Sequence, residues 1–129
     1  MAWQFTSDRP IYVQMSDQIV AGILSGTYQL GEKLPSVREF AIMASVNPNT
    51  VQRALFELEN IGLIETQRNT GKFVTSEDRL VEMARTKRGE ALVADFLKNM
   101  ADLGYSVEQT LGLLETAKKG GSGNERSNA

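Results

Sequence analysis

Between residues 34 and 61 the chain shows the strongest hydrophobic pattern, two helical stretches separated by a tight turn. In the first stretch, the apolar residues that share one helix face are Val37, Phe40, Ala41 and Ala44. In the second, the residues at three- and four-residue steps are Val51, Ala54, Leu55, Leu58 and Ile61. Both faces are expected to bury against one core, so the pattern predicts two helices that pack together.

The starts of these two helices are marked by capping residues. Ser36 and Glu39 have the spacing of a reciprocal capping box. Asn47 can accept a hydrogen bond from a free backbone N–H, and Pro48 suits the first helical position. A helix, a tight turn and a second helix with a polar outer face are typical of a DNA-reading helix-turn-helix.

Polar side chains on the outer faces are the candidate DNA contacts. Asn49, Gln52 and Arg53 carry amide and guanidinium groups that can pair with base edges and phosphates. Arg38 lies in the first turn of the preceding helix, where the positive helix end favours an anion, and it is the best candidate for a phosphate contact. The alternatives are an ordinary solvated helix face and, for Arg38, a surface salt bridge.

Residues 62–75 form two short alternating runs around a polar turn. This pattern predicts a two-stranded wing whose tip can touch the phosphate backbone or a groove. The residues at or near that tip are Arg68, Asn69, Thr70, Gly71 and Lys72. An ordinary hairpin with a soluble turn is the alternative.

The remaining segments are predicted to support this unit and to pair two chains. Residues 10–25 have apolar residues at four-residue steps and predict a helix that packs on the helix-turn-helix. A long helix over about 78–103 and a second short helix from Ser106 carry apolar stripes that two helices cannot bury alone. We therefore assign to homodimerisation the stripe residues Leu80, Ala84, Ala91, Phe96, Met100, Leu103, Leu111 and Leu114. Packing on the same chain is the alternative.

Five segments in order resemble the GntR family of bacterial transcription regulators, namely residues 10–15, 34–41, 46–51, 58–64 and 71–74. The resemblance implies a winged helix-turn-helix that binds double-stranded DNA operators as a homodimer. By motif position it implicates Arg38, Asn49, Thr50, Gln52 and the wing around Gly71. Residues 47–50, Asn-Pro-Asn-Thr, are similar to the YtrA-like branch with short C-terminal tails, which is associated with transporter genes. Many family members have a basic residue where this chain has Pro48.

Composition limits the functions that are open to the chain. The formal net charge is −2, so DNA binding needs a local positive surface, for which residues 38, 53, 68 and 72 are available. The chain has no histidine and no cysteine, so the sequence predicts no enzyme, no cofactor and no metal site. No apolar run approaches the length of a membrane span and no signal peptide is evident, so we expect a cytoplasmic protein.

The sequence as a whole predicts a mainly α fold with a small β-hairpin. Residues 1–76 are expected to form a winged helix-turn-helix, residues 77–119 a two-helix dimerisation segment, and residues 120–129 a disordered polar tail. The predicted function is a sequence-specific transcriptional regulator, a repressor, that binds a palindromic operator as a homodimer. The competing interpretation is a winged-helix protein–protein interaction module with Ile42, Met43 and Phe56 as its surface. A tail of about 40 residues cannot enclose a drug-sized cavity, although a small-molecule effector at the dimer interface stays open.

Overall fold

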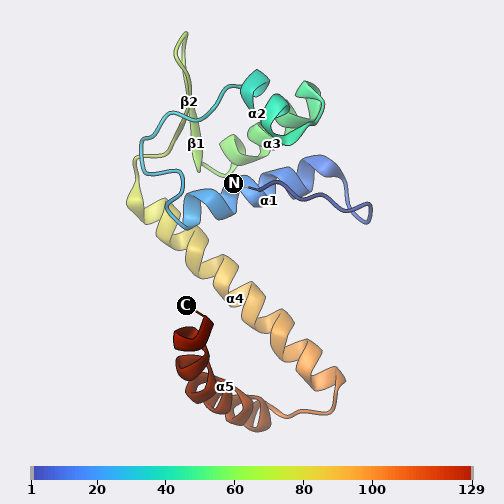
Figure 1. The fold of residues 1–129 in the computed structure, drawn as a ribbon. Coiled ribbons are helices and arrows are strands. Elements are labelled where there is room, and N and C mark those ends of the chain that lie inside the picture. The colour runs from blue at the N-terminus through green and yellow to red at the C-terminus, as the bar shows by residue number, and fades with distance from the viewer. Residues whose placement is uncertain (1, 129) are drawn as a thin grey trace. The chain divides into compact units, whose positions relative to one another are not determined.

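The computed structural model describes residues 2–128, with side chains described up to residue 120. Its helices and hairpin confirm the predicted fold class of a mainly α winged helix (Figure 1). The elements, in chain order, are α1 (Ile11–Leu24), α2 (Val37–Ala44), α3 (Pro48–Asn60), β1 (Ile64–Gln67), β2 (Gly71–Val74), α4 (Asp78–Asp102) and α5 (Val107–Asn128). The chain divides into two compact units, the first reaching Thr86 and the second starting at Lys87.

The first unit has a single apolar core between α1, α2 and α3. Phe40 of α2 is fully buried, and the rings of Trp3 and Tyr28 meet it edge-on at centroid distances of 5.9 and 6.4 Å. Two residues of the predicted stripes lie nearer the surface, since Ile11 is 36% and Ile61 is 60% exposed. Ile11 is the first residue of α1 and Ile61 is the C-cap of α3, so both lie at helix ends.

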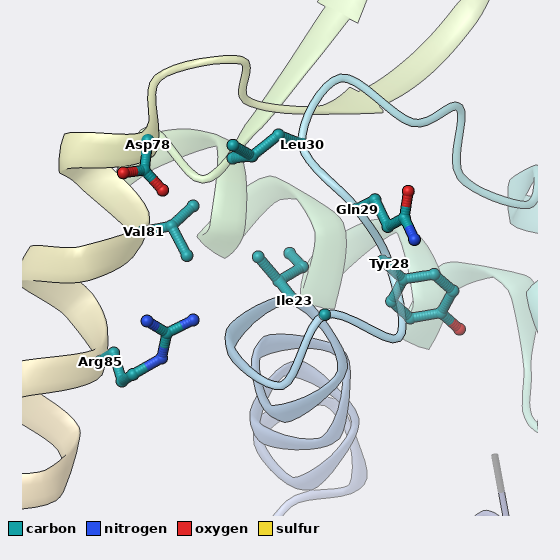
Figure 2. Close-up of a pocket in the computed structure, with 8 residues that line it drawn as sticks. Ile23, Tyr28, Gln29, Leu30, Asp78, Val81 and Arg85 are labelled. Atoms are coloured by element: carbon teal, nitrogen blue, oxygen red, sulfur yellow. The ribbon is translucent and has the colours of Figure 1, made fainter.

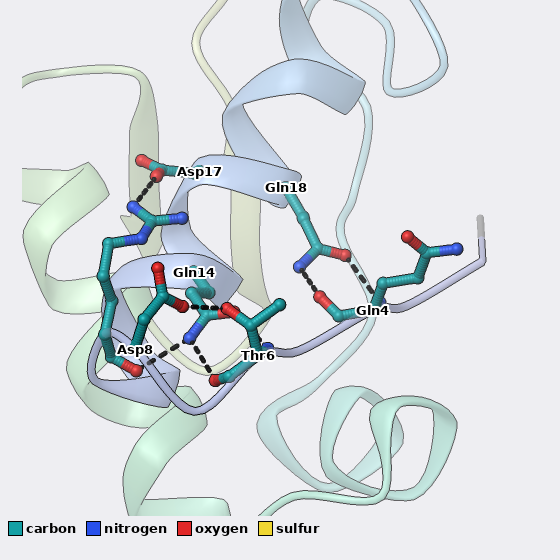
Figure 3. Close-up of polar contacts among 7 residues, drawn as sticks. Gln4, Thr6, Asp8, Gln14, Asp17 and Gln18 are labelled. Carbon is teal, nitrogen blue, oxygen red and sulfur yellow. Dashed lines mark hydrogen bonds and ion pairs between the residues drawn. The ribbon is translucent and has the colours of Figure 1, made fainter.

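A buried glutamine fixes the N-terminal segment against α1 (Figure 3). Gln14 Nε2 donates to the carbonyls of Thr6 (2.8 Å) and Arg9 (2.7 Å), while its Oε1 accepts from the Thr6 N–H (2.8 Å). Gln18 likewise pairs with both backbone groups of Gln4. Because every polar group of Gln14 is satisfied, its burial costs little, and the aromatic residues of the segment are held over the core.

The turn between α2 and α3 depends on one residue in a left-handed conformation. Ser45 ends α2 with φ 55° and ψ 48°, and its N–H and that of Val46 bond back to carbonyls of α2. A side chain in this region is strained, whereas glycine adopts it freely.

Replacing Ser45 with glycine should therefore raise the free energy of unfolding by about 0.5–1 kcal/mol, measured by urea denaturation. The matched control is Ser25→Gly at the end of α1, where φ is −84° and glycine relieves no strain. Ser25→Gly should destabilise the protein slightly. Equal effects of the two substitutions would contradict the strain at Ser45.

The hairpin is antiparallel, with Ile64 opposite Val74 and Gln67 opposite Gly71. Ile64 and Val74 are buried, and the turn at the other end is exposed. The segment that leads into α2 runs along β2, because the Leu34 N–H donates to the Lys72 carbonyl at 2.8 Å. The wing and the start of α2 are thus held side by side.

The first turns of α4 belong to the winged-helix unit, which reaches Thr86, whereas the sequence places the boundary between residues 76 and 77. Val81 is buried in the core and Ala84 packs against it, while Arg85 donates from Nε (3.1 Å) and Nη2 (2.7 Å) to the Leu24 carbonyl. Figure 2 shows Arg85 extending from α4 toward the end of α1, beside a hollow of about 350 Å³. The cation satisfies a free carbonyl at a helix C-terminus, which is its favoured place.

The second unit contains the rest of α4 and α5. Ser106 and Gln109 form the predicted capping box before α5. The predicted second helix is not short, because the backbone of α5 is helical to Asn128. The tail that we expected to be disordered is therefore helical up to that residue, and Ala129 lies outside the described residues. Extending a helix that has already nucleated adds one hydrogen bond per residue, which offsets the low helix propensity of glycine and serine.

Candidate nucleic-acid interface

Helix α3 begins at Pro48, as the sequence predicts, and it buries one apolar face. The Asn47 side chain accepts from the Asn49 N–H at 2.7 Å, and Pro48 is the first helical residue. The inner face buries residues 51, 54, 55 and 58. The outer face leaves Asn49 and Gln52 exposed, whereas Thr50 is half-buried. Both exposed amides are thus available to a partner that approaches α3 from outside.

Arg53, on the same outer face, has a partner on α1. Its guanidinium carbon lies 3.9 Å from the centroid of the Tyr12 ring. Stacking engages the flat face of the guanidinium and leaves its N–H groups in the plane free to donate. Tyr12 therefore restricts the direction of Arg53 without removing its capacity to bind an anion.

Arg38 lies in the first turn of α2 and is exposed. Ser36 and Glu39 form the capping box there, with Ser36 Oγ accepting from the Glu39 N–H at 3.1 Å and Glu39 Oε1 accepting from the Ser36 N–H at 2.8 Å. These bonds lower the pKa of Glu39. Arg38 makes no ion pair with any residue whose side chain is described, so the alternative of a surface salt bridge is not formed among those residues.

The tip of the wing is an exposed tight turn. Asn69 has φ 63° and Gly71 has φ 130°, and the Thr70 N–H donates to the Gln67 carbonyl at 3.0 Å. Arg68, Asn69 and Thr70 are all exposed. A Cβ on Gly71 would lie 3.1 Å from Lys33 Cε, so both conformation and space favour glycine there.

Lys72 differs from the other wing residues because its charge is paired. Its Nζ lies 2.5 Å from Glu59 Oε1 and donates to Thr66 Oγ1 at 2.9 Å, and that hydroxyl donates to Glu59 Oε2 at 2.5 Å. Burial alone would raise the pKa of Glu59, but the hydrogen bonds from Lys72 and Thr66 and the charge of Lys72 outweigh it and lower the pKa. Sequence reasoning missed this network, since Glu59 and Lys72 lie on different elements and follow no local spacing.

The predicted readers and the wing meet around one hollow of about 530 Å³. Its walls come from the start of α2, the outer face of α3 and strand β2, with lining residues Val37, Asn49, Gln52, Arg53, Phe56, Glu59 and Lys72. Phe56 is 60% exposed there. Arg38 and the exposed tip of the wing are not among the lining residues.

The predicted dimerisation residues have different environments. Ala84 packs against the winged-helix core, and Leu80 is half-buried. Residues 96, 103, 111 and 114 are exposed, and so are five further apolar residues of the second unit, Leu92, Val93, Tyr105, Val107 and Leu113. Among residues 87–120 only Thr110 is buried.

The described side chains contain no group of three acidic, histidine or cysteine residues placed to hold a metal ion. Over the described helices, none combines the length and the apolar character needed to span a bilayer.

Comparison with known proteins agrees with this architecture. The family model described as bacterial regulatory proteins, gntR family, matches residues 11–74. The chain is 40% identical over 118 residues to YhcF of Bacillus subtilis, an uncharacterized HTH-type transcriptional regulator, covering 92% of this chain and 98% of that protein. It is 43% identical over 88 residues to the transcriptional repressor YtrA of the same organism, covering 67% and 68%. A GntR family regulator from Listeria monocytogenes has a similar structure, with TM-score 0.82, 38% identity, and coverage of 87% and 98%.

Proposed function

The chain belongs to the GntR family of bacterial regulatory proteins and is a DNA-binding transcriptional regulator, not an enzyme, and we propose that it represses transcription by binding a palindromic operator as a homodimer. Repression is supported by the likeness to the repressor YtrA. Because DNA is the partner, we place the protein in the cytoplasm. Control of transporter genes, which the YtrA-like resemblance implies, stays a prediction.

The observation that carries the proposal is the shared hollow between the outer face of α3 and the wing. Helix α3 would enter the major groove, where amide and guanidinium groups can read base edges. The wing would lie beside it on the phosphate backbone. The proposed DNA contacts are Arg38, Asn49, Thr50, Gln52, Arg53, Arg68, Asn69, Thr70 and Gly71. Lys72, predicted from the sequence as a further contact, lies beside them with its charge paired to Glu59.

The proposal of a homodimer rests on the exposed apolar residues of the second unit alone. Residues 87–120 bury one side chain among themselves and leave many apolar residues open to water. Apolar surface of this kind marks an interaction site, and a second copy would supply a matching face about a two-fold axis. The two α3 helices of such a dimer would require half-sites about 34 Å apart, or a multiple of that distance.

The direct test is selection of bound duplexes from random sequence, followed by anisotropy titration with measurement of the mass in solution. We expect a palindromic consensus bound by a dimer, with affinity that falls steeply as salt rises. A folded protein that selects no sequence and binds a protein without salt dependence would favour the interaction module, with Ile42, Met43 and Phe56 as its surface.

The roles of individual contacts can be separated by substitution. Arg38→Ala should weaken binding to operator and random duplex by the same factor and reduce the salt slope by about one per subunit, as loss of a phosphate contact does. Asn49→Ala or Gln52→Ala should cost about 1–3 kcal/mol on the operator alone and relax base preference at defined positions. Anisotropy titrations of both duplexes measure these effects.

Arg79→Ala is the matched control for loss of charge, because Arg79 is exposed on α4 and lies outside the proposed contacts. It should leave both affinities nearly unchanged. Equal losses on operator and random DNA in all three interface variants would refute the division into readers and phosphate contacts.

A further inference from the structure

The ion pair between Glu59 and Lys72 joins three elements of the proposed interface. Glu59 lies in the last turns of α3, Thr66 on β1 and Lys72 on β2. The side chains of Lys72 and Glu59 are 25% and 28% exposed, so the pair is partly shielded from water. A shielded pair at 2.5 Å, with a hydroxyl that bonds to both partners, is stronger than an open surface pair.

The position of this pair puts a carboxylate among the DNA-facing groups. Glu59 and Lys72 line the same hollow as the readers Asn49 and Gln52. A phosphate that approached Lys72 would have to displace Glu59 and would leave that carboxylate facing the DNA without its cation. Both effects oppose a phosphate contact by Lys72.

We propose that Glu59 limits the affinity of this regulator for DNA of arbitrary sequence by holding Lys72 away from phosphates. Non-specific binding depends almost entirely on phosphate neutralisation, so one withheld lysine per subunit weakens it directly. Operator binding has base contacts in addition, so the same restraint leaves a larger share of that affinity intact. Glu59 is thereby a specificity-determining residue. The inference rests on the proposed DNA-binding face.

The test uses the full chain and random-sequence duplexes, titrated by anisotropy between 50 and about 200 mM salt. Glu59→Gln keeps the shape of the side chain and removes its charge. We expect affinity to rise at least about fivefold near 0.1 M salt, and the salt slope to steepen by roughly one per subunit. Glu65→Gln is the matched control, because Glu65 is exposed on β1 and is not joined to Lys72. It should change the slope much less.

A double-mutant cycle assigns the gain to Lys72. Lys72→Met alone should change binding to random DNA little, whereas Lys72→Met in the Glu59→Gln protein should abolish the gain. Thermal melting of each variant checks that the fold is kept. The inference is overturned if Glu59→Gln and Glu65→Gln act alike, or if Lys72→Met costs as much with Glu59 present as without it. Both outcomes are read on random duplexes, so they are independent of whether an operator is selected, which tests the proposed function.

Discussion

Replacement of Phe40 with alanine should lower the free energy of unfolding by about 3–5 kcal/mol, the usual cost of removing a fully buried aromatic side chain. Phe40 is 0% exposed, and two other rings pack edge-on against it. Its loss would leave a cavity where the N-terminal segment and α2 meet. Small domains have only about 5–15 kcal/mol of stability, so urea denaturation followed by circular dichroism should show a large shift of the midpoint.

Phe56 provides the matched control, because the same side chain is removed from a place that is 60% exposed. Phe56→Ala should change stability by no more than about 0.5 kcal/mol. Comparison of the two variants separates the effect of burial on stability from the effect of residue type. A larger loss for Phe56→Ala than for Phe40→Ala would show that the assigned core is wrong.

The parts of the fold that the sequence predicts well are those with local signals. The starts of α2 and α3 follow from capping residues within three positions of the helix, and the structure forms those bonds. The wing follows from alternation and from a turn that requires positive φ at residues 69 and 71. The exposed amides of Asn49 and Gln52 follow from helical periodicity.

Contacts between distant segments could not be predicted from such signals. Arg85 meets the Leu24 carbonyl across 61 residues, and the winged-helix unit reaches into α4. Arg53 stacks on Tyr12, and Lys72 pairs with Glu59 thirteen residues away. Each contact depends on how two elements pack, and local spacing does not show which charged residue meets which partner. Sequence therefore identifies the face that could bind DNA, but not the charges that are free on it.

Charges placed on the exposed face of α5 should convert a dimer to a monomer. Leu111 and Leu114 are 55% and 47% exposed and lie one turn apart, so both would be buried against a second copy. Aspartate at both positions would place two unpaired carboxylates in that interface, at several kcal/mol each. Sedimentation or light scattering should then give the mass of one chain, while circular dichroism keeps its helical signal because neither side chain belongs to a monomer core.

Operator affinity should fall with the loss of the dimer by at least about 100-fold, because two linked half-site contacts bind far more tightly than one. Ile61→Asp is the control, since it puts the same charge on a residue that is 60% exposed in the winged-helix unit and should keep the dimer mass. A variant with both leucines replaced that still has the mass of two chains would refute this face as the interface. A monomer that retained full operator affinity would instead refute the symmetric operator, because α3 and one wing would then suffice for recognition.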